Sequence, residues 1–354
     1  MRSQSFITLA LVLASAACGG ATGSSSSASS NDGGLDPNQD GGTIDPGAFM
    51  HVDAPLVGQL YDIWGSAAND AWITGDDGLL HWDGKSWTKY TDASTSALSG
   101  STFGVVTGTS ASDVWIMGGT PASPFVPVFS HFDGTSWSAP THGDAKHGQI
   151  YGGWATSAND VWAVGRDDGQ SAAFVMHYDG KAWTLVRTDA ATDLYSSVWA
   201  SNANDVWVAG HGGILHYDGK SWVAAGVQGN APRSIGKLHG TAHDDVWAVG
   251  LDANAFNPSL LHFDGTTWSV AHAGAKNEDF IGVFSPNRGT AITLGSSGID
   301  DSRANALIGV ANGTAWGSET VAPPGGANLG QLTRAWGAST GGTWIIGDEI
   351  LHRN

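Results

Sequence analysis

The sequence predicts an all-β protein assembled from one repeated sheet, and three observations support this. The 354 residues include 51 Gly and 17 Trp, while charged residues make up only 14% of the chain, against roughly 25% in average soluble domains. Only three residues are Glu and seven are Lys, so long surface helices would lack their commonest building blocks. A motif also recurs every 40 to 47 residues, a period typical of repeat architectures.

The repeated motif has two parts. The first is Asp, then Ala or Val, then Trp, and it begins at Asp70, Asp113, Asp160, Asp205 and Asp245. The second is His, an aromatic residue and Asp-Gly, with Trp three residues later, and it begins at His81, His131, His177, His216 and His262. A degenerate sixth copy covers residues 290–316, and a seventh covers residues 343–352.

Each copy predicts four short strands, which in the first copy we expect over residues 60–66, 70–74, 78–82 and 86–90. Asp-Gly between alternating apolar residues is a leading signal for a tight hairpin. Four antiparallel strands with this period describe a propeller blade. The sequence therefore predicts a seven-bladed β-propeller of four-stranded antiparallel blades over residues 46–354.

The two ends of this region predict how the ring closes. The seventh copy has only three strands, whereas residues 45–51 align with residues 83–89 and place Phe49 where the first copy has Trp87. We therefore expect an N-terminal strand to complete the C-terminal blade, which leaves no open sheet edge.

The repeated aromatic and His residues favour structural roles. Trp residues at one position of every blade are expected to pack between neighbouring sheets. Third-strand His residues of adjacent blades would lie about 10 Å apart, whereas zinc–imidazole bonds are about 2 Å long. We therefore expect a hydrogen bond within each blade and no metal site. The first strand should line the central channel, and its candidates are Trp64, Trp154, Trp199, His239 and Trp336.

Residues 1–17 are typical of a signal peptide, with Arg2, an apolar run over residues 6–14 and small residues before Cys18. The apolar run is too short to span a bilayer as a helix. Small residues before the only Cys resemble the lipobox of bacterial lipoproteins, which implies a lipid anchor on Cys18. Gly19 in place of Asp implies an outer-membrane or cell-surface destination. Ser15 departs from the usual Leu, and an ordinary cleavage site would give a periplasmic or secreted protein.

Residues 18–45 predict a lipidated Cys followed by a disordered Gly/Ser/Asp linker, because the segment has almost no apolar residues to bury. Residues 36–41 match the first half of a calcium loop. The twelfth position is Gly47 instead of a bidentate Glu, so chance is the favoured explanation. We expect no cofactor, with calcium left open.

Charge and composition also limit the partners. A formal charge of −18 and a pI near 4.8 argue against nucleic acid, whose binders need a basic surface. A single Cys excludes a disulfide within the chain. We expect a monomer that meets the membrane through its lipid and binds an unidentified protein or glycan.

The sequences D-V-W-A-V-G and L-H-Y-D-G-x-x-W resemble bacterial propeller repeats related to the kelch, WD40-like and sialidase-type families. They resemble repeats of secreted and surface lipoproteins that mostly lack an assigned activity. The sialidase Asp-box, S-x-D-x-G-x-x-W, is not matched, because Gly directly follows Asp here. The resemblance implies a fold and leaves the function open.

Spacing within the repeat predicts where ligands bind. The spacing across the first and third hairpins is constant, whereas the Trp-to-His spacing between second and third strands ranges from 8 to 16 residues. In an up-and-down blade the second turn and the blade connection share one face, which we call the insertion-bearing face. Binding surfaces are usually built on such insertions. The candidates are Asp76, Asp77, Phe125, Arg166, Asp167, Asp168, His211, Phe256, Asp300, Asp301, Arg303 and Asp348.

Two functions fit these observations. The first is a non-enzymatic cell-surface lipoprotein whose insertion-bearing face binds protein or glycan or serves as a scaffold. The alternative is a propeller glycoside hydrolase or polysaccharide lyase that uses Asp carboxylates. Sialidase-like chemistry would need clustered Arg residues and a Tyr nucleophile, and no Arg recurs at a channel position. Paired Asp carboxylates could still serve an inverting or calcium-assisted enzyme.

Overall fold

The computed structural model describes residues 49–55, 58–91, 94–190, 192, 194–228, 232, 234–251, 257–297, 305–313, 315–321, 331–338 and 342–353. The predicted signal peptide, the linker with Cys18 and the calcium-like residues 36–41 lie outside these residues. In the described part of the chain, no helix is long and apolar enough to cross a membrane.

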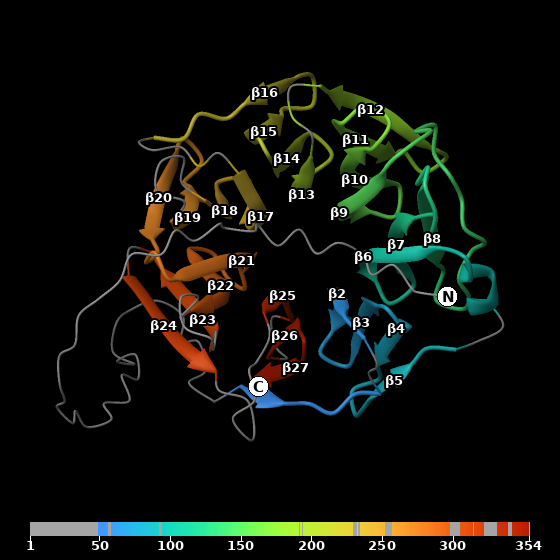
Figure 1. Ribbon diagram of the computed structural model, residues 1–354, viewed down its shortest axis with the longest axis horizontal. Coiled ribbons are helices and arrows are strands. Elements are labelled where there is room, and N and C mark those ends of the chain that lie inside the picture. Colours follow the sequence, from blue (N-terminus) through green and yellow to red (C-terminus); the bar gives the residue numbers. More distant parts are fainter. Residues whose placement is uncertain are drawn as a thin grey trace, which may run out of the picture. The chain divides into compact units, whose positions relative to one another are not determined.

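The described residues form seven antiparallel sheets that follow one another around an axis (Figure 1). The strands nearest the axis contact their neighbours in chain order, and the last contacts the first. These innermost strands are β2 (Leu60–Ala67), β6 (Thr102–Ser110), β9 (Gln149–Ser157), β13 (Tyr195–Asn202), β17 (Ser234–Ala242), β21 (Glu278–Phe284) and β25 (Leu332–Gly337).

Each innermost strand is followed outward by the next strands of its own chain segment. The second strands are β3 (Asp70–Gly75), β7 (Asp113–Gly119), β10 (Asp160–Asp167), β14 (Asp205–Gly210), β18 (Asp245–Leu251), β22 (Thr290–Ser297) and β26 (Thr343–Gly347). The third strands are β4 (Gly78–Trp82), β8 (Pro127–Phe132), β11 (Ala172–Tyr178), β15 (Gly213–Tyr217), β19 (Pro258–Phe263), β23 (Asn305–Asn312) and β27 (Ile350–Arg353).

The outer strands complete the blades and confirm the predicted seven-bladed β-propeller. They are β5 (Trp87–Lys89), β12 (Trp183–Asp189), β16 (Trp222–Ala224), β20 (Trp268–Ala273), β24 (Ala315–Val321) and, in the seventh blade, β1 (Met50–His51). In the second blade this place is taken by Trp137 and Thr141, which form isolated bridges to Phe132 and Phe129. A single-turn 3-10 helix, η1 (Thr95–Leu98), lies in the connection from the first blade to the second.

The predicted closure of the ring is confirmed in register. Met50 pairs with His352 and His51 with Leu351, as Thr88 pairs with His81 in the first blade. Phe49 therefore takes the place of Trp87, and its ring lies 4.0 Å from the Arg353 guanidinium carbon. The N-terminal strand thus covers the edge that β27 would otherwise expose.

Trp residues join neighbouring blades, as predicted. The second-strand Trp72 is 1% exposed and its ring centroid lies 5.3 and 5.5 Å from those of Phe132 and Trp137 in the next blade. Trp344 makes the corresponding contacts to Trp82 and Trp87, at 4.8 and 5.2 Å, across the closure. Edge-to-face and tilted aromatic pairs at such distances contribute about 0.5–1.5 kcal/mol each beyond their buried area.

Within each of the first five blades, a repeated network links three strands. The third-strand His donates from Nε2 to the first Asp of the second strand at 2.6–2.7 Å, and a Ser or Thr hydroxyl of the innermost strand donates to the same carboxylate. The His–Asp pairs are His81–Asp70, His131–Asp113, His177–Asp160, His216–Asp205 and His262–Asp245. The hydroxyls belong to Ser66, Thr109, Thr156, Ser201 and Thr241.

The network explains the conserved spacing within the repeat copies and confirms the predicted hydrogen bond. Each His also stacks on the second-strand Trp, with ring centroids 4.0–4.5 Å apart. Burial alone would raise the pKa of Asp70, but the hydrogen bonds from His81 and Ser66 outweigh burial and lower it. The same balance lowers the pKa of the other four Asp residues.

The first and third turns of each blade lie together on one face. Gly84 of the third turn has a φ of +89°, and a Cβ added there would lie 2.7 Å from the Cβ of Asn69 in the first turn. Asp83 accepts hydrogen bonds from the backbone N–H groups of Lys85 and Ser86, at 2.9 and 3.0 Å. These compact turns agree with the constant spacing across the first and third hairpins of the repeat.

Candidate functional site

A bulge occurs near the start of every innermost strand and defines one equivalent position in all seven blades. The bulge leaves one residue unpaired, for example Tyr61 between Leu60 and Asp62. The next residue in each blade is Asp62, Val105, Gly152, Ser197, Lys237, Gly282 or Arg334. Three of the seven are charged, and all three lie near the insertion-bearing end of the axis, because the innermost strands start at the blade connections.

Lys237 extends from the fifth blade toward the third. Its Nζ donates to the carbonyl oxygen of Ser196 on β13 at 2.9 Å and to that of Tyr151 on β9 at 3.3 Å. A side chain that bonds to a strand two blades away must lie on the axial side of the innermost strands. Lys237 therefore places an ammonium group beside the propeller axis.

Arg334 and Asp62 form an ion pair between the seventh and first blades. Arg334 Nε lies 3.5 Å from Asp62 Oδ1, and Arg334 Nη1 donates to the carbonyl oxygen of Thr333 at 2.8 Å. Asp62 Oδ2 accepts the backbone N–H of Val106 at 3.1 Å. The side chains of Arg334 and Asp62 are 24% and 20% exposed, so solvent reaches both. We call Asp62, Lys237 and Arg334 the axial cluster.

The axial cluster carries an excess positive charge within an acidic protein. Desolvation by burial and the nearby Arg334 lower the pKa of Lys237 to about 7, against the opposing effect of Asp62. Burial raises the pKa of Asp62, against the attraction of Arg334 and Lys237. Two cations and one carboxylate that act on one another at reduced solvation create a positive potential that favours anions.

The predicted channel residues lie on the innermost strands, two residues after the charged position. Their rings turn toward the next blade: Trp64 lies against Gly108, Trp199 against Gly240 and Trp336 against Gly65, each close enough to exclude a Cβ. Trp154 donates from Nε1 to the carbonyl oxygen of Ala200 at 2.9 Å. These aromatic rings therefore pack between adjacent innermost strands.

His239 replaces the aromatic wedge in the fifth blade. Its Nδ1 accepts the backbone N–H of Ser285 in the sixth blade at 3.1 Å, and its ring lies 5.4 Å from the ring of Trp154 and 4.9 Å from that of Phe284. Burial lowers the pKa of His239 to about 4. The imidazole is therefore neutral at pH 7 and serves as an acceptor between blades.

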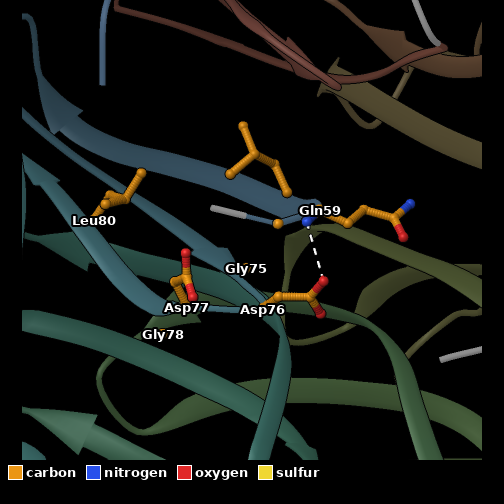
Figure 2. Close-up of a pocket in the computed structure, with 8 residues that line it drawn as sticks. Gln59, Gly75, Asp76, Asp77, Gly78 and Leu80 are labelled. Carbon is orange, nitrogen blue, oxygen red and sulfur yellow. Dashed lines mark hydrogen bonds between the residues drawn. The ribbon is translucent and has the colours of Figure 1, made fainter. Parts of the chain in front are cut away.

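The predicted loop residues of the first blade surround a small hollow (Figure 2). Asp76 accepts hydrogen bonds from the backbone N–H of Gln59 at 3.1 Å and from the hydroxyl of Tyr61. Burial, together with this hydrogen bond to Asp76, raises the pKa of Tyr61. The cavity, which Asp77 also lines, holds about 10 Å³. That is barely the space for one water molecule, so this corner closes the blade and leaves no room for a ligand.

The third blade carries a larger cavity at its insertion-bearing end, of about 370 Å³. Its lining combines the connection from the second blade with the β10–β11 turn and β12, and consists of Asp144, Ala145, Lys146, His147, Asp167, Gln170, Phe174, Leu185 and Thr188. Asp167 accepts the backbone N–H groups of Gly169 and Gln170 at 2.8 and 3.1 Å. The volume is within the range of small-molecule sites, about 300–1,000 Å³. We call it the blade-3 pocket.

Tyr151 contacts the axial cluster through its backbone and lies near charged residues at the end of β10. Its carbonyl oxygen binds Lys237, its hydroxyl donates to Gln149 Oε1 at 2.9 Å, and the residue is 37% exposed. Burial and the Asp168 carboxylate raise the pKa of Tyr151, against the effect of Arg166. Arg166 Nε lies 3.6 Å from Asp168 Oδ1. Of the predicted trio, Asp167 therefore lines the blade-3 pocket, while Arg166 and Asp168 act on Tyr151.

The remaining predicted loop residues are separate from these two sites. The carbonyl oxygen of Phe125 accepts the backbone N–H of Gly148 at 2.7 Å, and His211 pairs with Ser234 in an isolated bridge. Asp348 is exposed in the β26–β27 turn. Phe256, Asp300, Asp301 and Arg303 lie outside the described residues. Within the described ranges, no three His, Cys, Asp or Glu side chains are grouped so that they could hold a metal ion.

Sequence analysis missed the axial cluster, although a signal for it was present. The residue two positions before the first-strand aromatic is charged in three copies and Val, Gly or Ser in four. Comparing the copies for the position that varies most in charge would have found Asp62, Lys237 and Arg334.

No protein-family model matches the chain, and no curated protein matches its sequence. Solved structures with a similar fold include YCF48 from Cyanidioschyzon merolae, at 15% identity and a TM-score of 0.60 over 86% of this chain and 98% of that one. YCF48 bound to D1 peptide is similar at 12% identity and a TM-score of 0.61, over 86% and 94%. An ancestral GH74 enzyme is similar at 14% identity and a TM-score of 0.56, over 85% and 45%. At these identities the likeness shows the fold alone.

Proposed function

We propose that this protein is a non-enzymatic binding module, held at the outer membrane or cell surface by a lipid on Cys18. It binds a protein segment across the insertion-bearing face, from the axial cluster over Tyr151 to the blade-3 pocket. The observation that carries this proposal is the Lys237–Tyr151 contact of 3.3 Å, which joins the charged axis to the polar residues of the third blade. Tyr and Arg are among the residues that are enriched in protein interfaces.

A protein ligand suits this surface better than a polymer substrate. The repeated turns of the other face use their polar groups in internal hydrogen bonds, as Asp83 does with Lys85 and Ser86. A partner is therefore more readily bound by the polar groups of the insertion-bearing face. A structural neighbour, YCF48, is described bound to D1 peptide, which illustrates a peptide on the same fold. The carboxylate of Asp167 accepts backbone N–H groups of its own turn, and that of Asp76 accepts the backbone N–H of Gln59, so both already serve the local structure.

A photocrosslinking amino acid placed on each face tests the binding proposal in cells. Substitution at Tyr151 puts the crosslinker on the proposed surface, and substitution at Lys181 puts it in the third turn of the same blade on the opposite face. We expect a discrete protein adduct from position 151 alone. Equal adducts from both positions, or none from 151, would refute the proposal, and binding only on a glycan array would assign the surface to glycans.

The anchor and the absence of catalysis need separate tests. Intact-mass analysis of the membrane fraction should show acyl chains on the wild-type protein, while Cys18→Ala should move the protein to the soluble fraction. A soluble, unacylated wild-type protein would contradict the anchor. Depolymerisation of any member of a polysaccharide panel, lost on Asp168→Asn, would instead establish the enzyme alternative.

A further inference from the structure

We propose that the axial cluster binds one carboxylate group of the ligand, between the ammonium of Lys237 and the guanidinium of Arg334. This inference rests on the proposed function for the origin of the carboxylate, which would be an acidic side chain or chain terminus of the bound protein segment. The site itself requires only the three axial residues.

The charge of the cluster matches a monoanion. With Lys237 and Arg334 protonated and Asp62 ionised, the cluster has a net charge of +1. A buried charge that lacks a counterion is costly, and a carboxylate supplies one negative charge. A phosphate dianion would replace the excess positive charge by an excess negative one, so a carboxylate fits the balance better.

The donors of the cluster are only partly used. Lys237 Nζ has three N–H groups and makes two hydrogen bonds, both to backbone carbonyls. Arg334 donates from Nη1 to Thr333 and faces Asp62 through Nε, and its Nη2 has no hydrogen-bond partner among the described residues. A carboxylate with two oxygens can accept from a guanidinium and an ammonium together, in charge-assisted bonds.

The surroundings of Lys237 leave few other groups to compete for the anion. Arg334 on β25 and Asp62 on β2 are the charged groups that act on it. β9 and β13 present the carbonyl oxygens of Tyr151 and Ser196, while β6 and β21 present Val105 and Gly282 at the equivalent position. An anion can therefore approach Lys237 without displacing another carboxylate from it. To reach Arg334 as well, the anion must compete with Asp62, whose Oδ1 lies 3.5 Å from Arg334 Nε.

Titration of Lys237 reports directly on anion binding. Because the pKa of Lys237 is lowered to about 7, an anion that binds the protonated form must raise it by linkage. The chain has seven Lys residues, so lysine labelled with ¹³C at Cε gives seven NMR signals. Loss of one signal in Lys237→Met assigns it, and Lys181→Met is the control on the exposed third turn.

The experiment compares the Lys237 titration midpoint in about 0.1 M sodium acetate with that in about 0.1 M sodium chloride, where screening is equal. We expect acetate to raise the midpoint by about 0.5 pH unit or more, which is a threefold or larger change in proton affinity. Arg334→Leu should abolish the difference, and the other six signals should not respond. Identical midpoints in acetate and chloride would overturn the proposal.

Two further arms separate the alternatives. A shift that is larger in phosphate than in acetate at equal ionic strength would overturn the carboxylate assignment in favour of a phosphate group. The acetate response measures the axial site alone, whereas the crosslinking experiment measures the surface. A positive acetate response with no adduct from position 151 would refute the protein-binding function and retain the carboxylate site. An adduct from position 151 with no acetate response would retain the protein-binding function and refute the carboxylate site.

Discussion

Two sets of charged residues in this propeller differ in how often they occur. The His–Asp network appears in five blades with nearly identical geometry, at 2.6–2.7 Å. The axial cluster uses one strand position that is equivalent in all seven blades, yet it places a different residue there in nearly every blade. Both sets contain ionisable side chains that are partly shielded from water.

The difference shows how function can be separated from structure in a repeat protein. A residue required by the blade must recur wherever the blade recurs, so the repeated His and Asp residues are explained by the hairpins they hold together. A single ligand meets the propeller once, and its contacts need not follow the rotational symmetry. A residue that differs from the other repeat copies at a position open to solvent therefore indicates a binding site. The predictions below test whether the repeated residues serve stability and the unrepeated ones serve binding.

The largest effect is expected at a repeated Trp. Trp247 is fully buried, and Trp247→Ala should lower the free energy of unfolding by about 3–5 kcal/mol, because the cavity adds to the lost transfer energy. Val223, on the outer strand β16, is 57% exposed, and Val223→Ala should change it by under about 0.5 kcal/mol. Chemical denaturation measures both, and similar losses would contradict the assigned roles.

His239 should make stability depend on pH on the acidic side of neutrality. Its folded pKa of about 4 is below the unfolded value of about 6.5, so the unfolded state binds more protons between these values. Stability is therefore full at pH 7 and falls as the pH drops from 6.5 to 4, by about 3 kcal/mol. The difference between wild type and His239→Phe, measured across this range, should show that slope, and a constant difference would contradict it.

Removing a carboxylate from the repeated network should cost less than removing Trp247. Asp245→Ala leaves His262, Thr241 and the backbone N–H of Gly289 without their acceptor, and we expect a loss of about 2–3 kcal/mol. The adjacent Asp244 pairs with the exposed Arg288, and Asp244→Ala should cost clearly less. Thermal and urea unfolding of both variants test this, and equal losses would show that the network adds nothing.

Lys237→Met should cost less stability than Asp245→Ala. We expect its free energy of unfolding at pH 7 to lie within about 1 kcal/mol of wild type or above it, because the folded protein holds the lysine where its charge is disfavoured. Since the folded pKa of Lys237 is below the unfolded value, wild type should gain stability relative to the variant from pH 7 to 10. A large loss at pH 7 would make Lys237 a structural residue.

The fold was predictable because every blade repeats the same evidence. The Asp-Gly turns and the constant first- and third-hairpin spacing gave the strands to within one or two residues, and Phe49 in the Trp position gave the closure. The second blade was the exception: Trp137 predicted a regular fourth strand, but the chain forms only isolated bridges there before it turns into the blade-3 pocket. Local pairing of an outer strand depends on the connection that follows it, which the repeat does not describe.

The candidate site was only partly predictable. Arg166, Asp167 and Asp168 were found because they lie in an insertion, but Lys237 was missed because a bulge shifts the alternation of side chains by one residue. Its contact with Tyr151 joins residues 86 positions apart, and that proximity follows from the order of blades around the axis. Strand period alone cannot indicate which innermost side chain reaches across.

The most direct test of the account measures partner affinity and melting temperature together in two variants. Once the crosslinked partner is identified, the double variant Lys237→Met/Arg334→Leu should bind it at least about tenfold more weakly, with a melting temperature close to wild type. Asp205→Asn, in the repeated network, should melt earlier and bind with unchanged affinity while folded. The reverse pattern, with affinity lost in Asp205→Asn and retained in the axial variant, would contradict the separation of structural repeat from binding site.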